Sequence, residues 1–159
     1  MLEKHTWVFF YGLYMDFEIL RERGLRVQHW EVAKLDGYEF RISSWGYIKR
    51  SDVNCVYGVV VCAAQQEVLD LYAPATSTLP LDYFPEPVLV ESPDGQLRNV
   101  LCYVATSEPQ GAEVNVDYVE GMVRLARHFA FPDWYVERLE SFRPALQKTP
   151  DVNCAIASS

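Results

Sequence analysis

Basic residues are few in this sequence, and their scarcity argues against a nucleic-acid partner. Lys and Arg total 14 among 159 residues, whereas Asp and Glu total 22, so the formal net charge is −8. The basic residues are scattered and do not alternate with aromatic side chains, as they do on surfaces that bind a phosphate backbone. We therefore expect no nucleic acid among the partners.

Long apolar runs are missing as well. Residues 1–5 precede a very short apolar run that lacks the length and the cleavage pattern of a signal peptide. No later run approaches the ~20 apolar residues of a membrane-spanning helix. These absences predict a cytoplasmic protein with no membrane partner.

Cysteine and histidine are sparse and form no recognisable motif. The four cysteines include no Cys-x-x-Cys pair, and Cys62 and Cys102 lie inside apolar runs, where cysteine behaves as a small core residue. The three histidines have no serine or cysteine partner in a nucleophile motif, and no glycine-rich phosphate loop precedes a long helix. The sequence therefore predicts reduced structural thiols, with neither a metal site nor a cofactor.

The abundant residue types suit a buried core. Hydrophobic residues make up 50% of the chain and aromatic residues 14%, which is enough to bury a substantial core and argues against general disorder. The length favours a single domain, predicted over 1–148, with a disordered tail at 149–159.

The opening stretch is the first candidate site. An apolar, strand-like run at 7–10 is followed by Gly12, and a helix-like segment at 16–23 comes next. A strand that breaks at glycine and gives way to a helix leaves backbone N–H groups unpaired, and such groups bind a carboxylate or a developing oxyanion. Because many glycine turns carry no site, a plain turn is the alternative.

The rest of the chain alternates between extended and helical patterns. Residues 27–42 show period-two alternation, and Asp36-Gly37 within them is either a hairpin turn or a bulge in one long strand. The helix predicted at 63–72 carries Val68, Leu69 and Leu71 on its buried side. The later elements are a polar connection at 45–54, a buried strand at 56–62, a helix at 63–72, a proline-rich loop at 73–85, a hairpin of strands at 88–91 and 97–105, a helix capped by Asn115 or Asp117, and a last helix that starts at Pro132. Hairpins and short helices without regular βαβ alternation predict an α+β fold.

Several motifs, taken in chain order, resemble the γ-glutamylcyclotransferase superfamily. The run Tyr11-Gly12-Leu13-Tyr14-Met15 resembles the Tyr-Gly-Ser-Asn-Leu/Met loop that opens that family. The other matching segments are the family's second strand at 33–40, its Val-x-Gly-Val-Val strand at 56–60, its Leu-Asp helix at 68–70, its Tyr-x-Arg-x-x-Val-x-Val run at 83–90 with Pro85 in place of arginine, and its C-terminal helix pair at 118–139. The resemblance covers most of the chain.

This resemblance implies a fold, a ligand and a reaction. The family fold is a small, mostly antiparallel barrel with flanking helices, and its pocket binds a γ-glutamyl group through the backbone of the opening loop. In the family reaction the glutamyl α-amine attacks its own γ-carbonyl, releases an amine and leaves 5-oxoproline, while a glutamate moves the proton. The resemblance thus implies a small-molecule partner with the ligand-binding residues Tyr11, Gly12, Leu13, Tyr14, Met15, Ala73 and Tyr103.

Two positions depart from the family pattern. Ala73 stands at the position of the family glutamate, and Leu13 stands at the position of the loop serine. We therefore expect weakened or diverged cyclotransferase chemistry and a ligand bulkier or less polar than glutathione. If the chemistry survives, Asp82 is the expected proton carrier and Tyr83 the expected hydrogen-bond donor to the substrate.

The alternative is a catalytically inactive binding or protein-interaction module on the same fold. The missing glutamate favours this alternative, as do Trp45 and Trp134, which are expected to be exposed. The sequence does not indicate an oligomeric state.

Overall fold

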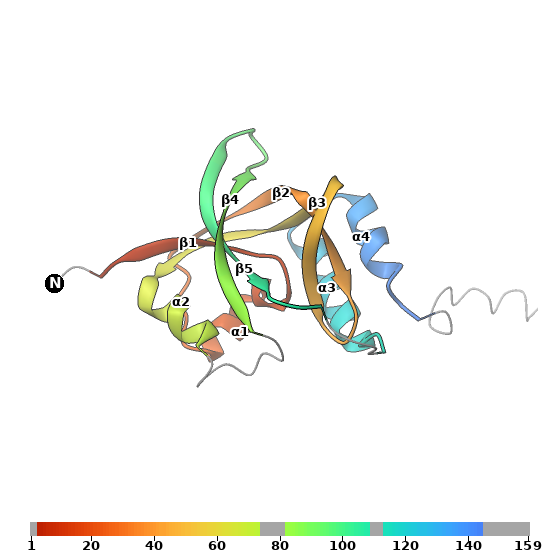
Figure 1. Ribbon diagram of the computed structural model, residues 1–159, viewed down its shortest axis with the longest axis horizontal. Coiled ribbons are helices and arrows are strands. Elements are labelled where there is room, and N and C mark those ends of the chain that lie inside the picture. Colours follow the sequence, from red (N-terminus) through yellow and green to blue (C-terminus); the bar gives the residue numbers. More distant parts are fainter. Residues whose placement is uncertain (1–2, 74–81, 109–112, 145–159) are drawn as a thin grey trace, which may run out of the picture.

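The computed structural model describes residues 3–73, 82–108 and 113–144, which form five strands, four α-helices and one 3₁₀ helix. Figure 1 shows the strands and the helices α1 to α4. The elements are β1 (His5–Phe10), η1 (Leu13–Met15), α1 (Phe17–Glu22), β2 (His29–Ile42), β3 (Gly46–Ala64), α2 (Gln65–Tyr72), β4 (Tyr83–Glu91), β5 (Leu97–Ala105), α3 (Val116–His128) and α4 (Asp133–Glu140). The predicted α+β class is confirmed.

The strands close into one barrel in the order β1-β3-β2-β4-β5. The β1–β3, β2–β3, β2–β4 and β4–β5 pairs are antiparallel, and the parallel pair of β1 with β5, at Val8 and Leu101, closes the barrel. This is the small, mostly antiparallel barrel that the resemblance implied.

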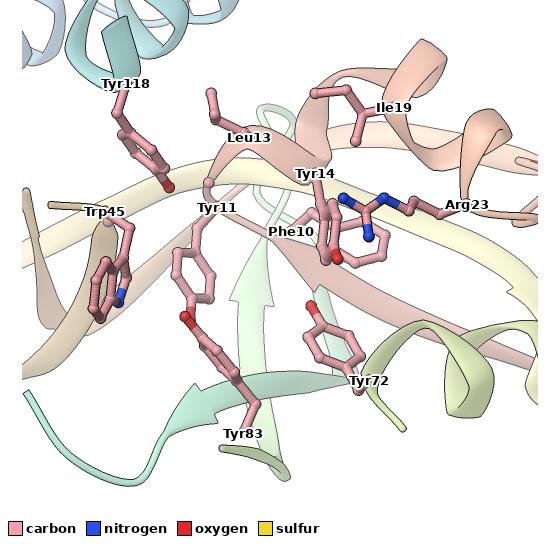
Figure 2. A pocket seen from close by; sticks show the side chains of 12 residues that line it. Phe10, Tyr11, Leu13, Tyr14, Ile19, Arg23, Trp45, Tyr72, Tyr83 and Tyr118 are labelled. Carbon is pink, nitrogen blue, oxygen red and sulfur yellow. The ribbon is translucent and has the colours of Figure 1, made fainter. Parts of the chain in front are cut away.

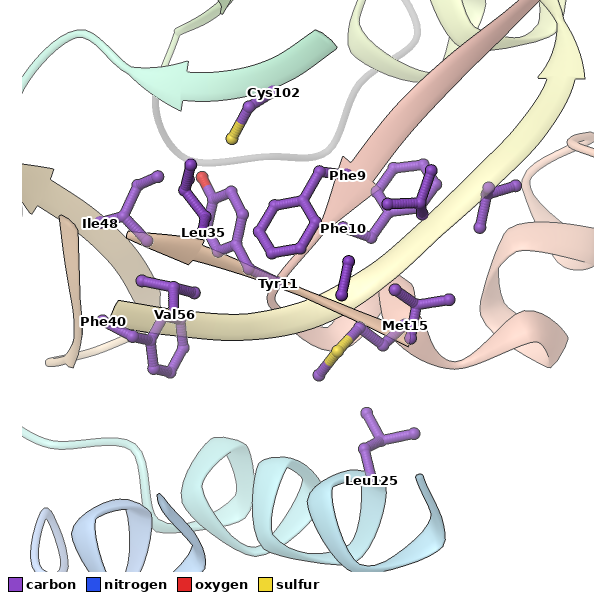
Figure 3. Packing of buried hydrophobic residues seen from close by; sticks show 14 of the residues in the cluster. Phe9, Phe10, Tyr11, Met15, Leu35, Phe40, Ile48, Val56, Cys102 and Leu125 are labelled. Carbon is purple, nitrogen blue, oxygen red and sulfur yellow. The ribbon is translucent and has the colours of Figure 1, made fainter. Parts of the chain in front are cut away.

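The core fills the barrel and the space between the barrel and α3. Phe9, Phe40, Val56 and Cys102 come from four different strands, and each is at most 1% exposed. Figure 3 shows Leu125 of α3 pointing towards the barrel and towards Met15. Because full burial of one such apolar side chain is worth roughly 1.5–3 kcal/mol, this shared core fixes where η1 and α3 meet the strands.

The long β2–β3 ribbon corrects one prediction. Residues 46–54 belong to β3, so the polar connection predicted over 45–54 is wrong apart from its first residue. Tyr47 and Ile48 at the start of this segment are buried, whereas the side chains beyond them are mostly polar and the backbone pairing continues, with Glu39 opposite Lys49. Asp36-Gly37 forms a bulge rather than a hairpin turn, because β2 continues through it with a register shift. Gly37 has φ +89°.

Side chains at the helix starts decide the capping alternatives. The Asn115 Oδ1 accepts from the Tyr118 N–H at 3.2 Å, so Asn115 rather than Asp117 caps α3. Asp16 caps α1 in the same way, by accepting from the Glu18 N–H at 3.0 Å. Pro132 is the N-cap residue of α4, so this helix begins at Asp133, one residue later than predicted.

Two further predictions about the middle of the chain are corrected. Leu69 is 49% exposed rather than buried, and of the three residues predicted on the buried side of this helix only Val68 and Leu71 are buried. The strand β4 begins at Tyr83 and includes Pro85, so the predicted loop at 73–85 extends too far. Proline is tolerated there where its missing N–H breaks no ladder bond. Most of that loop, 74–81, lies outside the described residues, as do Cys154 and the predicted tail at 149–159.

Cys62 and Cys102 are both buried, as predicted for core thiols, and the described cysteines are all free. No helix in the described ranges is long and apolar enough to cross a membrane. The single domain over 1–148 stays a prediction.

Candidate functional site

A cavity of about 280 Å³ opens beside the turn that follows β1. Figure 2 shows that most of its labelled wall is aromatic, with side chains arriving from several elements that are distant in sequence. The lining residues are Phe10, Tyr11, Gly12, Leu13, Tyr14, Ile19, Arg23, Trp45, Gly46, Tyr72, Tyr83 and Tyr118.

The turn itself uses part of its own hydrogen-bonding capacity. The Met15 N–H donates to the Gly12 carbonyl at 3.0 Å, and the Asp16 N–H donates to the Leu13 carbonyl at 2.9 Å, which together form η1. The Met15 side chain is fully buried in the core, where it fixes the turn against α3. The Met15 amide, one of the groups predicted to hold the ligand, is therefore already engaged.

Tyr118 of α3 directs its hydroxyl at the turn. A Cβ atom on Gly12 would lie 2.7 Å from the Tyr118 Oη, and one on Gly46 would lie 2.6 Å from it, so two glycines make room for this phenol. Burial raises the pKa of Tyr118, and hydrogen bonds from the backbone amides of Gly46 and Leu13 offset part of the rise. The Tyr118 hydroxyl therefore occupies the position in front of the Leu13 amide.

Tyr103 supports the floor of the cavity from behind. The Tyr11 hydroxyl donates to the Tyr103 carbonyl at 2.7 Å, and this buried bond fixes the Tyr11 ring. The Tyr103 ring stacks on the ring of Tyr72 at a centroid distance of 3.9 Å and an interplanar angle of 4°. Tyr103 thus positions two rings of the wall without lining the cavity itself.

Hydrogen-bond donors gather at the side of the cavity formed by η1, α1 and α2. The rings of Tyr14 and Tyr72 meet edge to face at 5.8 Å, and Figure 2 shows the Arg23 guanidinium beside Tyr14. The Tyr14 Oη is buried and has no hydrogen-bond partner among the described residues. Burial raises the pKa of Tyr14, with Arg23 offsetting part of the rise, and burial raises the pKa of Tyr72 well above its ordinary value.

Trp45 lies on the opposite side of the cavity from Tyr14 (Figure 2). Its Nε1 is buried and, within the described part of the chain, has no hydrogen-bond partner. The prediction that Trp45 is exposed is wrong, because the tight turn before β3 folds the indole onto the cavity wall. Trp134 is 49% exposed, as expected.

The sequence matches no family model and no curated protein. Among solved structures, a γ-glutamyl cyclotransferase matches with a TM-score of 0.73 at 18% identity, over 98% of this chain and 100% of that chain. An uncharacterised human protein matches with a TM-score of 0.74, also at 18% identity, over 98% of this chain and 99% of that one. A yeast γ-glutamyl cyclotransferase described as specific to glutathione matches with a TM-score of 0.59 at 10% identity, over 87% and 95% of the two chains. This chain has the γ-glutamylcyclotransferase fold.

Within this γ-glutamylcyclotransferase fold, only some of the predicted site residues line the cavity. Tyr11, Gly12, Leu13, Tyr14 and Tyr83 line it. The predicted site residues that do not line it are Met15, Ala73, Asp82 and Tyr103. The Asp82 side chain is exposed, and its carbonyl accepts from the Thr106 N–H at 3.0 Å.

The sequence analysis missed lining residues from α1, the β2–β3 turn, α2 and α3. Tyr72 had a usable signal, because it directly precedes Ala73, the position of the family glutamate. No short sequence motif indicated Arg23, Trp45 or Tyr118, because only the tertiary fold brings these residues to the turn. The remaining missed residues are Phe10, Ile19 and Gly46.

The polarity of the cavity in this γ-glutamylcyclotransferase fold is one-sided. Its described lining residues include hydroxyl, indole and guanidinium donors but no carboxylate. Such a wall favours ligand groups that accept hydrogen bonds and carry negative charge over groups that donate them.

Proposed function

We propose that the cavity binds a small molecule that joins a carboxylate or an amide to an aromatic or other apolar group. The observation that carries this proposal is the combination of an aromatic wall with two buried donors, the Tyr14 Oη and the Trp45 Nε1, that have no partner among the described residues. An unsatisfied buried donor is destabilising, and a ligand oxygen would relieve it.

The wall also supports a ligand less polar than glutathione. Leu13 and Ile19 present alkyl groups, and the rings of Phe10, Tyr11 and Tyr118 present flat apolar surfaces. Aromatic rings prefer offset-stacked or edge-to-face partners, so a ligand ring would be favoured over a peptide-like group. A γ-glutamyl amide of an aromatic amine has both the acceptor groups and the ring.

We expect only weak cyclotransferase activity in this cavity. Formation of 5-oxoproline moves a proton from the attacking amine to the leaving amine, and no carboxylate among the described lining residues can carry it. A general acid or base typically contributes about 10²–10⁴-fold to the rate. If turnover remains, Asp82 is the proposed proton carrier, because it adjoins Tyr83, and Tyr83 is the proposed donor to the substrate.

The binding test uses γ-glutamyl anilide, γ-glutamylalanine and the α-carboxamide of the anilide, which lacks the carboxylate. The anilide should bind most tightly and, at about 100 times its Kd, should stabilise the folded protein by about 2.7 kcal/mol in thermal unfolding. It should also change the tryptophan fluorescence, and Trp45→Phe should remove most of that change. Trp134→Phe is the matched control, because Trp134 lies away from the cavity. If no compound shifts the unfolding temperature, the proposed function is wrong.

Release of 5-oxoproline from the same compounds tests the chemistry. We expect little or none from γ-glutamylalanine, and robust turnover would show that the proposal of weakened chemistry is wrong. Any measurable rate should disappear in Asp82→Asn and persist in Asp52→Asn, which alters an exposed aspartate of β3. An unchanged rate in Asp82→Asn would remove Asp82 from the mechanism.

A second candidate, a protein-interaction module, is favoured by the half-exposed indoles of Trp30 and Trp134. Sedimentation that depends on concentration, together with no response to any compound, would support this candidate over small-molecule binding.

A further inference from the structure

The geometry points to a carboxylate subsite formed by the hydroxyls of Tyr14 and Tyr72 and the guanidinium of Arg23, in place of the backbone amides of the turn. This inference rests on the proposed function and assigns the position of the ligand's negative charge within the same cavity. It also differs from the expectation for the sequence, which placed anion binding on residues 12–15.

The amides of the turn are poorly available for an anion. The Met15 N–H donates to the Gly12 carbonyl at 3.0 Å within η1. The Leu13 amide faces the Tyr118 hydroxyl, which is buried and also approached by the Gly46 amide. A carboxylate at the turn would therefore have to displace a buried phenol held between two glycines.

The proposed subsite, by contrast, already has converging donors. Tyr14 comes from η1, Arg23 from the C-cap of α1 and Tyr72 from the last residue of α2. The Tyr14 and Tyr72 rings meet edge to face at 5.8 Å, and the Tyr72 ring is held flat against Tyr103 at 3.9 Å. Figure 2 shows both hydroxyls and the guanidinium on the same side of the cavity. Two fixed rings present their hydroxyls with little remaining rotational freedom, which favours binding.

The charge distribution also favours an anion there. Arg23 is the one charged residue among the described residues that line the cavity. The phenols of Tyr14 and Tyr72 are protonated at neutral pH, since the ordinary pKa of tyrosine is 10.0 and burial raises it further, so each hydroxyl can donate. Hydrogen bonds to a carboxylate are stronger than those to a neutral acceptor, so a carboxylate should gain more from this cluster than an amide does.

The ligand class that fits is an arylalkyl carboxylate. With its carboxylate at Tyr14 and Tyr72, an aromatic ring would lie along Tyr11 towards Trp45 and Tyr118 (Figure 2). The Trp45 Nε1 would then meet an acceptor at the far end of the ligand, such as a carbonyl.

The test compares 3-phenylpropionate with 3-phenylpropionamide, which has nearly the same shape and no charge, by calorimetry on the full chain. Wild-type protein should bind the carboxylate at least tenfold more tightly than the amide. Tyr14→Phe, Tyr72→Phe and Arg23→Gln should each lower carboxylate affinity about tenfold, as expected for one lost charge-assisted hydrogen bond. Each should change amide affinity less than about threefold, and this retained binding shows that the cavity is still folded.

Tyr57→Phe is the matched control, because Tyr57 packs against Phe131 and Tyr135 and lies outside this cavity. It should leave both affinities unchanged. If Tyr14→Phe with Tyr72→Phe keeps the full preference for the carboxylate, or weakens both probes equally, the subsite is wrong although the cavity still binds ligand. If wild-type protein binds neither probe nor any γ-glutamyl compound, the proposed function fails as well.

Discussion

Gly58 shows how a position without a side chain sets the contact between two strands. A Cβ atom there would lie 2.3 Å from the Phe10 carbonyl oxygen and 2.7 Å from the Phe9 Cζ. Both atoms belong to β1, which ends directly at the cavity turn. Neither atom can move easily, because one is backbone and the other belongs to a ring that is 1% exposed. The position of the turn therefore depends on glycine at 58.

Gly58→Ala should destabilise the protein by about 2 kcal/mol or more, because the added methyl group overpacks the β1–β3 contact. The free energy of unfolding in urea measures this cost. Gly121→Ala is the control: its Cβ atom would meet only the flexible end of Leu13, at 3.1 Å, and alanine favours the interior of α3 by up to about 1 kcal/mol. Equal stabilities of the two variants would contradict this account.

Single residues also show which part of the site could be predicted from the sequence. The local pattern, a strand that breaks at glycine, indicated the turn at Gly12, the family resemblance added Tyr11 and Tyr14, and all three residues line the cavity. Tyr118 is far along the chain, and its effect on the Leu13 amide depends on the packing of α3 against the turn. No periodicity within α3 distinguishes a phenol that fills a site from one that fills a core.

At the scale of elements, prediction succeeded where side chains alternate or where turn chemistry is specific. The hairpin predicted from strands at 88–91 and 97–105 is the β4–β5 pair, and Gly95 in the turn between them has φ +87°, which glycine adopts readily. The first part of β3 was missed, because 49–54 has one apolar residue, Val53, and that residue is exposed. A ribbon that extends beyond the core needs only backbone pairing, and no hydrophobic pattern reports backbone pairing.

The N-terminus of α3 links helix stability to the cavity. Asn115 caps the helix through the Tyr118 N–H, and its own N–H donates to the Ser43 carbonyl at 2.9 Å, which ties α3 to the β2–β3 turn. Tyr118 is in the first turn of this helix, so the cap also holds the phenol that faces the turn after β1.

Asn115→Ala should lower the free energy of unfolding by about 1 kcal/mol, because the side-chain cap is lost. Asn115→Asp keeps an acceptor at the cap and should stay close to wild type. Chemical denaturation of the three proteins under identical conditions measures the difference. If the alanine and aspartate variants are equally stable, the Asn115 side chain does not cap α3 in the way described.

For the molecule as a whole, the concentration of buried phenols around one cavity predicts a response to alkaline pH. Burial raises the pKa of Tyr83 to about 12 from an ordinary value of 10.0, and raises those of Tyr11 and Tyr72 well above it. Desolvation disfavours the phenolate, so these groups hold their protons longer in the folded protein than in the unfolded chain. Their contribution to stability is complete below pH 10 and is lost as pH rises through the folded pKa values.

Stability should therefore fall above about pH 10, by about 1.4 kcal/mol per pH unit for each such tyrosine, because the unfolded chain releases protons that the folded protein keeps. Urea unfolding between about pH 9 and pH 11 measures the slope, and tyrosine absorbance follows the ionisation. Tyr83→Phe should reduce this slope by the contribution of one tyrosine. Tyr57→Phe should reduce it less, because burial raises the pKa of Tyr57 by less than it raises the pKa of Tyr83. A slope unaffected by Tyr83→Phe would show that this phenol ionises as readily in the folded protein as in the unfolded chain.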